Sequence, residues 1–221
     1  MDNPWLNLPP NAPYVLSIDR EHIDKHNHAC HTDTQIITDS FPQPFIGDPI
    51  RARVVLLALN PGHSDLDEQD HKANEDFKRD MRLNLRHGLD AHPFYPLNPK
   101  FLKTGAGKWW MTATKALQEA GVSIPTLSER LMVIEWLPYH SLRFAMPKEL
   151  LPSQEYSFNL ARQMMDDNKL IVRMRSRKQW TDVHPDFKRM SALSNPRCAH
   201  ISRGNTKEDL FDRILAALRD N

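Results

Sequence analysis

The sequence predicts an α/β fold with three layers, α/β/α, in which a central, mostly parallel sheet lies between helices. Two continuous apolar runs, residues 54–59 and 131–134, have the length and β-branched content of fully buried strands. A third run begins at residues 170–172. Helical patterns separate these runs, and strands that alternate with helices are typical of parallel sheets.

The predicted helices follow from the spacing of apolar residues. Residues 107–120 and 153–166 carry apolar side chains at helical spacing, and the clearest stripe lies in the last helix, over 210–218. Residues 64–86 are very polar and are expected to be helical or loop-like, whereas three prolines predict a long loop over 91–104.

Two domain-level segments are expected. Residues 1–48 form an irregular arm, packed on the domain, with one short helix around 19–26, and residues 49–221 form the α/β domain. The arm contains a dense group of residue types that bind zinc, but at no established zinc spacing. We therefore expect a polar arm without metal or cofactor, and a metal-dependent hydrolase is the alternative. The group consists of His22, His26, His28, Cys30 and His31.

Composition favours a globular protein without disulfides. Two cysteines cannot form a disulfide framework, no apolar run is as long as a membrane span, and the first residues lack a signal-peptide pattern. We expect a cytoplasmic monomer without a membrane partner. The net charge is only +1, but residues 63–80 carry a net −4 and residues 162–203 a net +6. Such asymmetry can mark a binding face.

The basic segment contains three arginines that alternate with other residues. At strand spacing Arg173, Arg175 and Arg177 are expected to share one face, which favours phosphate binding. Trp180 follows and is a candidate for stacking on a base. A salt-bridged surface opposite the acidic segment is the alternative.

Two motifs carry a family resemblance. Residues 58–62 (ALNPG), a buried strand running into Asn-Pro-Gly, resemble the first motif of the uracil-DNA glycosylase superfamily, closest to its single-strand-selective and mismatch-specific branches. Residues 193–197 (LSNPR), followed by Ser-Arg-Gly at 202–204, resemble the second motif of those branches. The first motif ends an early strand and the second precedes the final helix, as in that family. The resemblance covers residues 50–220 and implies the superfamily's α/β/α fold.

The resemblance also implies an activity. The chain would hydrolyse the N-glycosidic bond of a damaged or deaminated base, uracil or a related one, in DNA, including single-stranded DNA, or in another nucleic acid. Asn60 would position the water that attacks the C1′ carbon of a flipped nucleotide. Pro61, Gly62 and His63 would form part of the substrate site, where the backbone approaches the base.

The second motif implies contacts with the base and the nucleic acid. By this match Asn195 would face the pocket and Arg197 would act as a wedge or a phosphate contact, with Arg203 as a further cation. Phe77, Phe94 and Tyr95 are candidates for the aromatic side chain that stacks on the base. The adjacent residues 109–110 (Trp-Trp) are expected to pack within a helix.

The chain departs from the family pattern at two places. Leu193 stands where the single-strand-selective branch has a histidine that stabilises the departing base, and residues 135–138 (EWLP) offer no asparagine to bind the base edge. Tyr139 and His140 lie just beyond and are candidates to contact the base in place of that asparagine. His140 is a candidate replacement acid or hydrogen-bond donor, and a structural histidine is the alternative. These departures favour a second hypothesis, a non-catalytic nucleic-acid-binding or base-sensing protein of the same fold.

Overall fold

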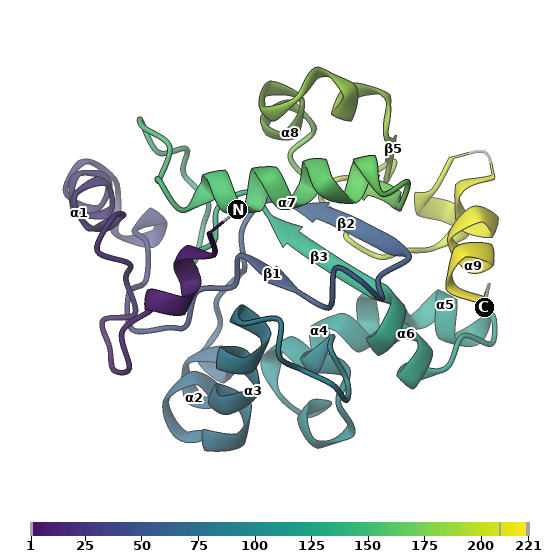
Figure 1. The fold of residues 1–221 in the computed structure, drawn as a ribbon, viewed down its shortest axis with the longest axis horizontal. Helices are drawn as coiled ribbons and strands as arrows, with labels where there is room; N and C mark the ends of the chain where they lie inside the picture. Colours follow the sequence, from purple (N-terminus) through teal and green to yellow (C-terminus); the bar gives the residue numbers. More distant parts are fainter. Residues whose placement is uncertain (1, 208, 220–221) are drawn as a thin grey trace.

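The sheet confirms the predicted α/β class. A computed structural model of the chain describes residues 2–207 and 209–219. In this part of the chain five strands form one sheet in the order β1-β3-β2-β4-β5 (Figure 1). Only β1 is antiparallel to its neighbour, and the other pairs are parallel. The strands are β1 (Phe45–Ile46), β2 (Val54–Ala58), β3 (Leu131–Glu135), β4 (Leu170–Arg173) and β5 (Ser191–Ala192).

The three longer strands are the predicted apolar runs. Strand β2 lies between β3 and β4, with Val54 in register with Leu131 on one side and with Leu170 on the other. All residues of β2 and β3 are buried. A strand that is covered on both faces has no polar side to display, which explains the continuous apolar runs.

Helices cover both faces of the sheet. Figure 1 shows α7 and α8 on one side and α2 to α6 on the other, and α9 packs near α6. The predicted helix over 107–120 is interrupted at Thr114, whose hydroxyl donates to the Trp110 carbonyl (2.7 Å). The helices are α1 (Arg20–Ala29), α2 (Asp65–Ala73), α3 (Glu75–Leu85), α4 (Gly105–Ala113), α5 (Lys115–Glu119), α6 (Ile124–Arg130), α7 (Gln154–Asp166), α8 (Arg177–Val183) and α9 (Leu210–Arg219).

The N-terminal arm is more closely tied to the domain than the sequence suggests. The arm contributes β1 to the sheet. Its Asp19 is fully buried and accepts hydrogen bonds from the Tyr139 hydroxyl (2.7 Å) and the Ser153 amide (2.9 Å).

Within the described ranges no group of three or more His, Cys, Asp or Glu side chains is placed to hold a metal ion. No helix in those ranges is long and apolar enough to cross a membrane.

Candidate functional site

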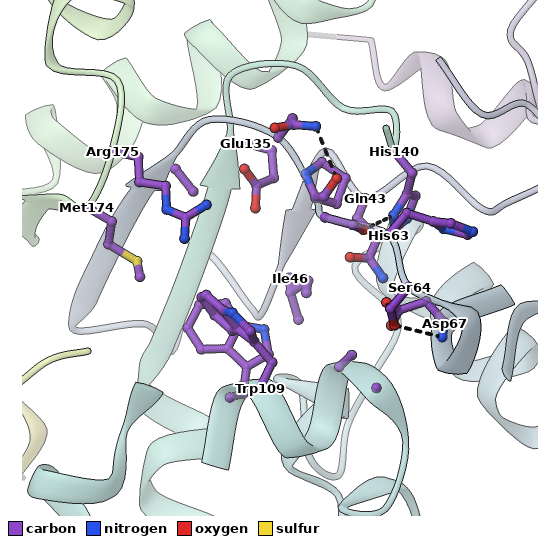
Figure 2. Close-up of a pocket in the computed structure, with 17 residues that line it drawn as sticks. Gln43, Ile46, His63, Ser64, Asp67, Trp109, Glu135, His140, Met174 and Arg175 are labelled. Atoms are coloured by element: carbon purple, nitrogen blue, oxygen red, sulfur yellow. Dashed lines mark hydrogen bonds between the residues drawn. The ribbon is translucent and has the colours of Figure 1, made fainter. Parts of the chain in front are cut away.

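A cavity of about 290 Å³ opens at the carboxyl ends of β2, β3 and β4 (Figure 2). The chain leaves β2 towards β3 and later returns to β4 on the opposite side, and ligands in open α/β sheets bind at such a change of direction. Helix α4 contributes the wall opposite the strand ends. The lining residues are Gln43, Ile46, Ala58, Asn60, Pro61, Gly62, His63, Ser64, Asp67, Gly105, Ala106, Trp109, Trp110, Glu135, His140, Met174 and Arg175.

The strand register determines the floor of the cavity. Glu135 is the partner of Ala58 across the β2–β3 ladder, and Met174 directly follows Arg173, the partner of Leu57. All three of Glu135, Ala58 and Met174 line the cavity. The small alanine therefore leaves room between a carboxyl group and a thioether.

Asn60 lies just after β2 and lines the cavity, and two hydrogen bonds fix the orientation of its side-chain amide. Its Nδ2 donates to the Ser141 hydroxyl (2.9 Å) and to the Pro61 carbonyl (3.1 Å). No group in the described chain donates to its Oδ1. Because the nitrogen side of the amide is held by two partners, the oxygen side is left to accept a hydrogen bond from a water molecule. Pro61, Gly62 and His63 continue the same wall.

His140 lines the cavity but is neutral at pH 7. Its Nδ1 lies 2.6 Å from the Gly62 carbonyl, which can only accept, so Nδ1 carries the proton and donates. Burial, opposed by the hydrogen bond to the Gly62 carbonyl and aided by the His63 ring 5.7 Å away between centroids, lowers the pKa of His140 to about 4. An imidazole in this state stabilises the loop at Gly62 and has no proton left for a base, which does not fit the expectation of a replacement acid or hydrogen-bond donor at His140.

Glu135 is the carboxyl group of the cavity. Its side chain is 8% exposed, and no group in the described chain is bonded to its Oε2. Burial raises the pKa of Glu135 to about 8, and the Arg175 guanidinium opposes that rise. The Nε atom of Arg175 is itself buried without a partner among the described residues. From the sequence, this position stands out only because it lacks the asparagine of the family. An acidic residue at the end of a buried strand is the signal that indicates a candidate site residue here.

Trp109 forms an aromatic wall that the sequence reasoning did not expect. It lies on α4, is 42% exposed, and meets the buried Trp110 edge to face, 4.5 Å between ring centroids. The three aromatic candidates from the sequence are core residues and do not line the cavity. They are Phe77, Phe94 and Tyr95, each at most 1% exposed.

The second-motif loop lies away from the cavity. Asn195 is exposed. Its side-chain Oδ1 accepts a hydrogen bond from the backbone amide of Arg197 (3.0 Å), and its own backbone amide donates to the Asn205 Oδ1 (2.8 Å). The expectation that Asn195 faces the pocket is therefore wrong, because its side chain is used to turn the loop. Leu193 is fully buried in the core.

The three alternating arginines do not share a face. Strand β4 ends at Arg173, and the left-handed backbone of Ser176 (φ 60°) turns the chain into α8. Arg173 is buried and donates to two backbone carbonyls. Arg175 reaches the cavity, while Arg177 donates to the Leu193 carbonyl.

Other predicted contacts are also structural. Tyr139 is fully buried on Asp19, outside the pocket. Trp180 is fully buried, and its Nε1 donates to the Ala58 carbonyl (2.7 Å), so it cannot stack on a base. Arg203 pairs with Asp212 through two hydrogen bonds (2.9 and 2.6 Å).

Arg197 is the remaining second-motif cation. It is exposed, and within the described ranges no group bonds to its side chain. Among the five arginines expected to bind nucleic acid, Arg197 and Arg175 are therefore the two whose guanidinium is not bonded to another residue of the described chain. Comparison of the chain with protein-family models, curated proteins and solved structures found no match.

Proposed function

We propose that the chain hydrolyses the N-glycosidic bond of a base in DNA or another nucleic acid, as a divergent relative of the uracil-DNA glycosylase superfamily. The observation that carries the proposal is Asn60 itself, which lines the cavity at the end of β2 while Ser141 and the Pro61 carbonyl hold the nitrogen side of its amide and leave Oδ1 without a partner in the described chain. The resemblance of residues 58–62 to the first superfamily motif supports it independently.

The cavity suits a flat heterocycle. Trp109 offers an indole on α4, and Ala58 and Met174 offer an apolar floor on the sheet. Glu135 and Arg175 supply polar atoms at the edge (Figure 2). A base reaches such a slot only after it leaves the stack, and aromatic stacking then replaces part of what is lost.

The reaction needs a positioned water more than a strong base. The C1′–N bond lengthens with positive charge developing on the sugar, so a neutral water held at Asn60 Oδ1 is sufficiently nucleophilic. The C1′–N bond breaks as the C1′–O bond forms, and fixed orientation supplies most of the acceleration. The exposed Arg197, on the second-motif loop away from the cavity, would contact a phosphate elsewhere along the nucleic acid.

A non-catalytic base-binding protein is the second candidate. The observation that favours it is the placement of the second motif, since Leu193 is in the core and Asn195 is outside the cavity. In that case the same cavity would bind a base without releasing it.

Base release from oligonucleotides tests the proposal. The purified chain is incubated with single- and double-stranded DNA and RNA that carry uracil, hypoxanthine, xanthine or alkylated bases, and released base is measured by chromatography. We expect release by the wild type and a loss of at least roughly 10²-fold in Asn60→Ala. Ser141→Ala frees one side of the amide and should show an intermediate rate. Binding of these oligonucleotides without release of any base would establish the non-catalytic alternative.

A further inference from the structure

We infer that Glu135 is the acid of this pocket, a neutral carboxylic acid that hydrogen-bonds to the base and transfers its proton as the base departs. The inference rests on the proposed function and goes beyond it by naming the group that serves the leaving base. It also restricts the substrate to bases with a hydrogen-bond acceptor on the edge that meets Glu135.

The position of the carboxyl group supports this role. Glu135 is the last residue of β3 and is in register with Ala58 on the neighbouring strand β2. Asn60 follows Ala58 by two residues, so Glu135 and Asn60 lie at the same edge of the sheet. Figure 2 shows the Glu135 carboxyl and the Arg175 guanidinium directed into the space above Trp109. The Oε2 atom is buried without a partner in the described chain. Buried polar atoms normally have partners, so an unpartnered one in a side chain that lines a cavity indicates a missing ligand atom.

The surroundings keep this carboxyl group protonated. The other titratable groups that line the cavity come from the segment after β2 (His63), from α2 (Asp67), from the segment after β3 (His140) and from the segment after β4 (Arg175). Of these only Arg175 affects the pKa of Glu135, by lowering it, and burial outweighs this effect to raise the pKa to about 8. Strand β1 adds only apolar side chains beside β3.

A neutral acid is what the leaving base requires. The electron pair of the broken C1′–N bond goes to the base, and an ionised carboxylate nearby would repel that developing negative charge. A protonated carboxyl group instead stabilises it, as raised-pKa carboxyl groups do in glycoside hydrolysis. His140 cannot serve, because its only proton at neutral pH is on Nδ1 and bonded to Gly62.

The proton balance closes within the pocket. Glu135 gives its proton to the base, which leaves neutral. The water held at Asn60 Oδ1 forms the C1′–O bond and loses one proton, which returns to the Glu135 carboxylate. The sum is addition of water across the C1′–N bond, with both side chains restored.

The decisive variant is Glu135→Gln, which keeps a hydrogen-bond donor and the side-chain shape but has no transferable proton. Single-turnover release is measured from oligonucleotides that carry uracil or 5-fluorouracil, which are similar in size but differ in the stability of the departing anion. We expect a loss of roughly 10²–10⁴-fold on uracil and a clearly smaller loss on 5-fluorouracil. Glu129→Gln, an exposed acid on α6, is the charge-matched control and should match the wild type.

The pH profile gives a second readout. Wild-type release should fall above about pH 8 as Glu135 ionises, and Glu135→Gln should lack that limb. Equal losses on the two bases with an unchanged pH profile would overturn the acid role, while Asn60-dependent release by the wild type would leave the proposed function intact. If the wild type releases another base instead, two released bases of different acidity give the same comparison. Absence of release from every substrate would overturn both proposals.

Discussion

The buried carboxyl group of Glu135 should make the stability of the fold depend on pH. The pKa of this group is 4.5 as an ordinary glutamate and about 8 in the folded chain. Because the folded pKa is the higher one, its contribution to stability is fully present below pH 4.5 and is lost progressively as pH rises to about 8. Glu135→Gln has no carboxyl group to ionise and should not show this loss.

The size of the effect follows from the two pKa values. Each pH unit between them corresponds to about 1.4 kcal/mol, so the free energy of unfolding should fall by about 5 kcal/mol across the full range. About 3 kcal/mol of this is reached at pH 7. For a chain of this length 1 kcal/mol corresponds to about 2–4 °C in Tm, so the change is on the order of 10 °C.

Thermal unfolding followed by circular dichroism at pH 5, 6, 7 and 8 measures this dependence. The Tm difference between Glu135→Gln and the wild type should grow in favour of the variant at each step up in pH. The exposed control Glu129→Gln should keep a constant offset from the wild type. Parallel curves for the wild type and Glu135→Gln would show that the carboxyl group ionises freely in the folded chain, and the reasoning about a neutral acid would then be refuted.

Two further predictions separate structural side chains from ligand-binding ones. Trp180→Phe removes the hydrogen bond to the Ala58 carbonyl and should lower the free energy of unfolding in urea by about 2–3 kcal/mol, whereas Trp109→Phe should change it by less than about 1 kcal/mol. Similar losses for both would contradict the assignment of Trp180 to the core. Arg197→Ala should weaken oligonucleotide binding and reduce the slope of log K against log salt by about one in fluorescence anisotropy. Arg173→Ala should instead destabilise the fold, because its guanidinium is bonded to backbone carbonyls.

The longer strands could be predicted because a strand that is buried on both faces consists of consecutive apolar residues, a pattern that is visible in the sequence. Strands β2 and β3 are covered on both faces, and each is a continuous apolar run. Strands β1 and β5 have two residues each, too few for any periodicity. Helix α8 was missed because the alternating arginines before and within it resemble a strand, and only the left-handed Ser176 shows where the strand pattern ends.

The candidate site was predictable where it depends on a strand end and not where it depends on packing. Asn60 to His63 follow β2, so their place at the carboxyl edge needs only the strand itself. The roles of Glu135 and Trp109 depend on the register of β3 against β2 and on the approach of α4. The sequence shows only a local part of this packing: a Cβ at Gly107 would lie 2.0 Å from the Phe101 carbonyl oxygen, so the glycine lets α4 pack closely on the segment just before it.

The Glu135→Gln variant is expected to raise the stability of the fold and to lower the rate of base release. Because these two effects are opposite in sign, measuring both tests why an acid is present at this position. A buried, unpartnered carboxyl group destabilises the fold at neutral and alkaline pH, so stability alone would favour an amide at this position. Glu135→Gln should therefore be more stable at pH 8 and yet slower at base release. Proteins often keep destabilising residues where activity needs them. If the variant gains stability and keeps full activity, the carboxyl group has no part in the chemistry of this pocket.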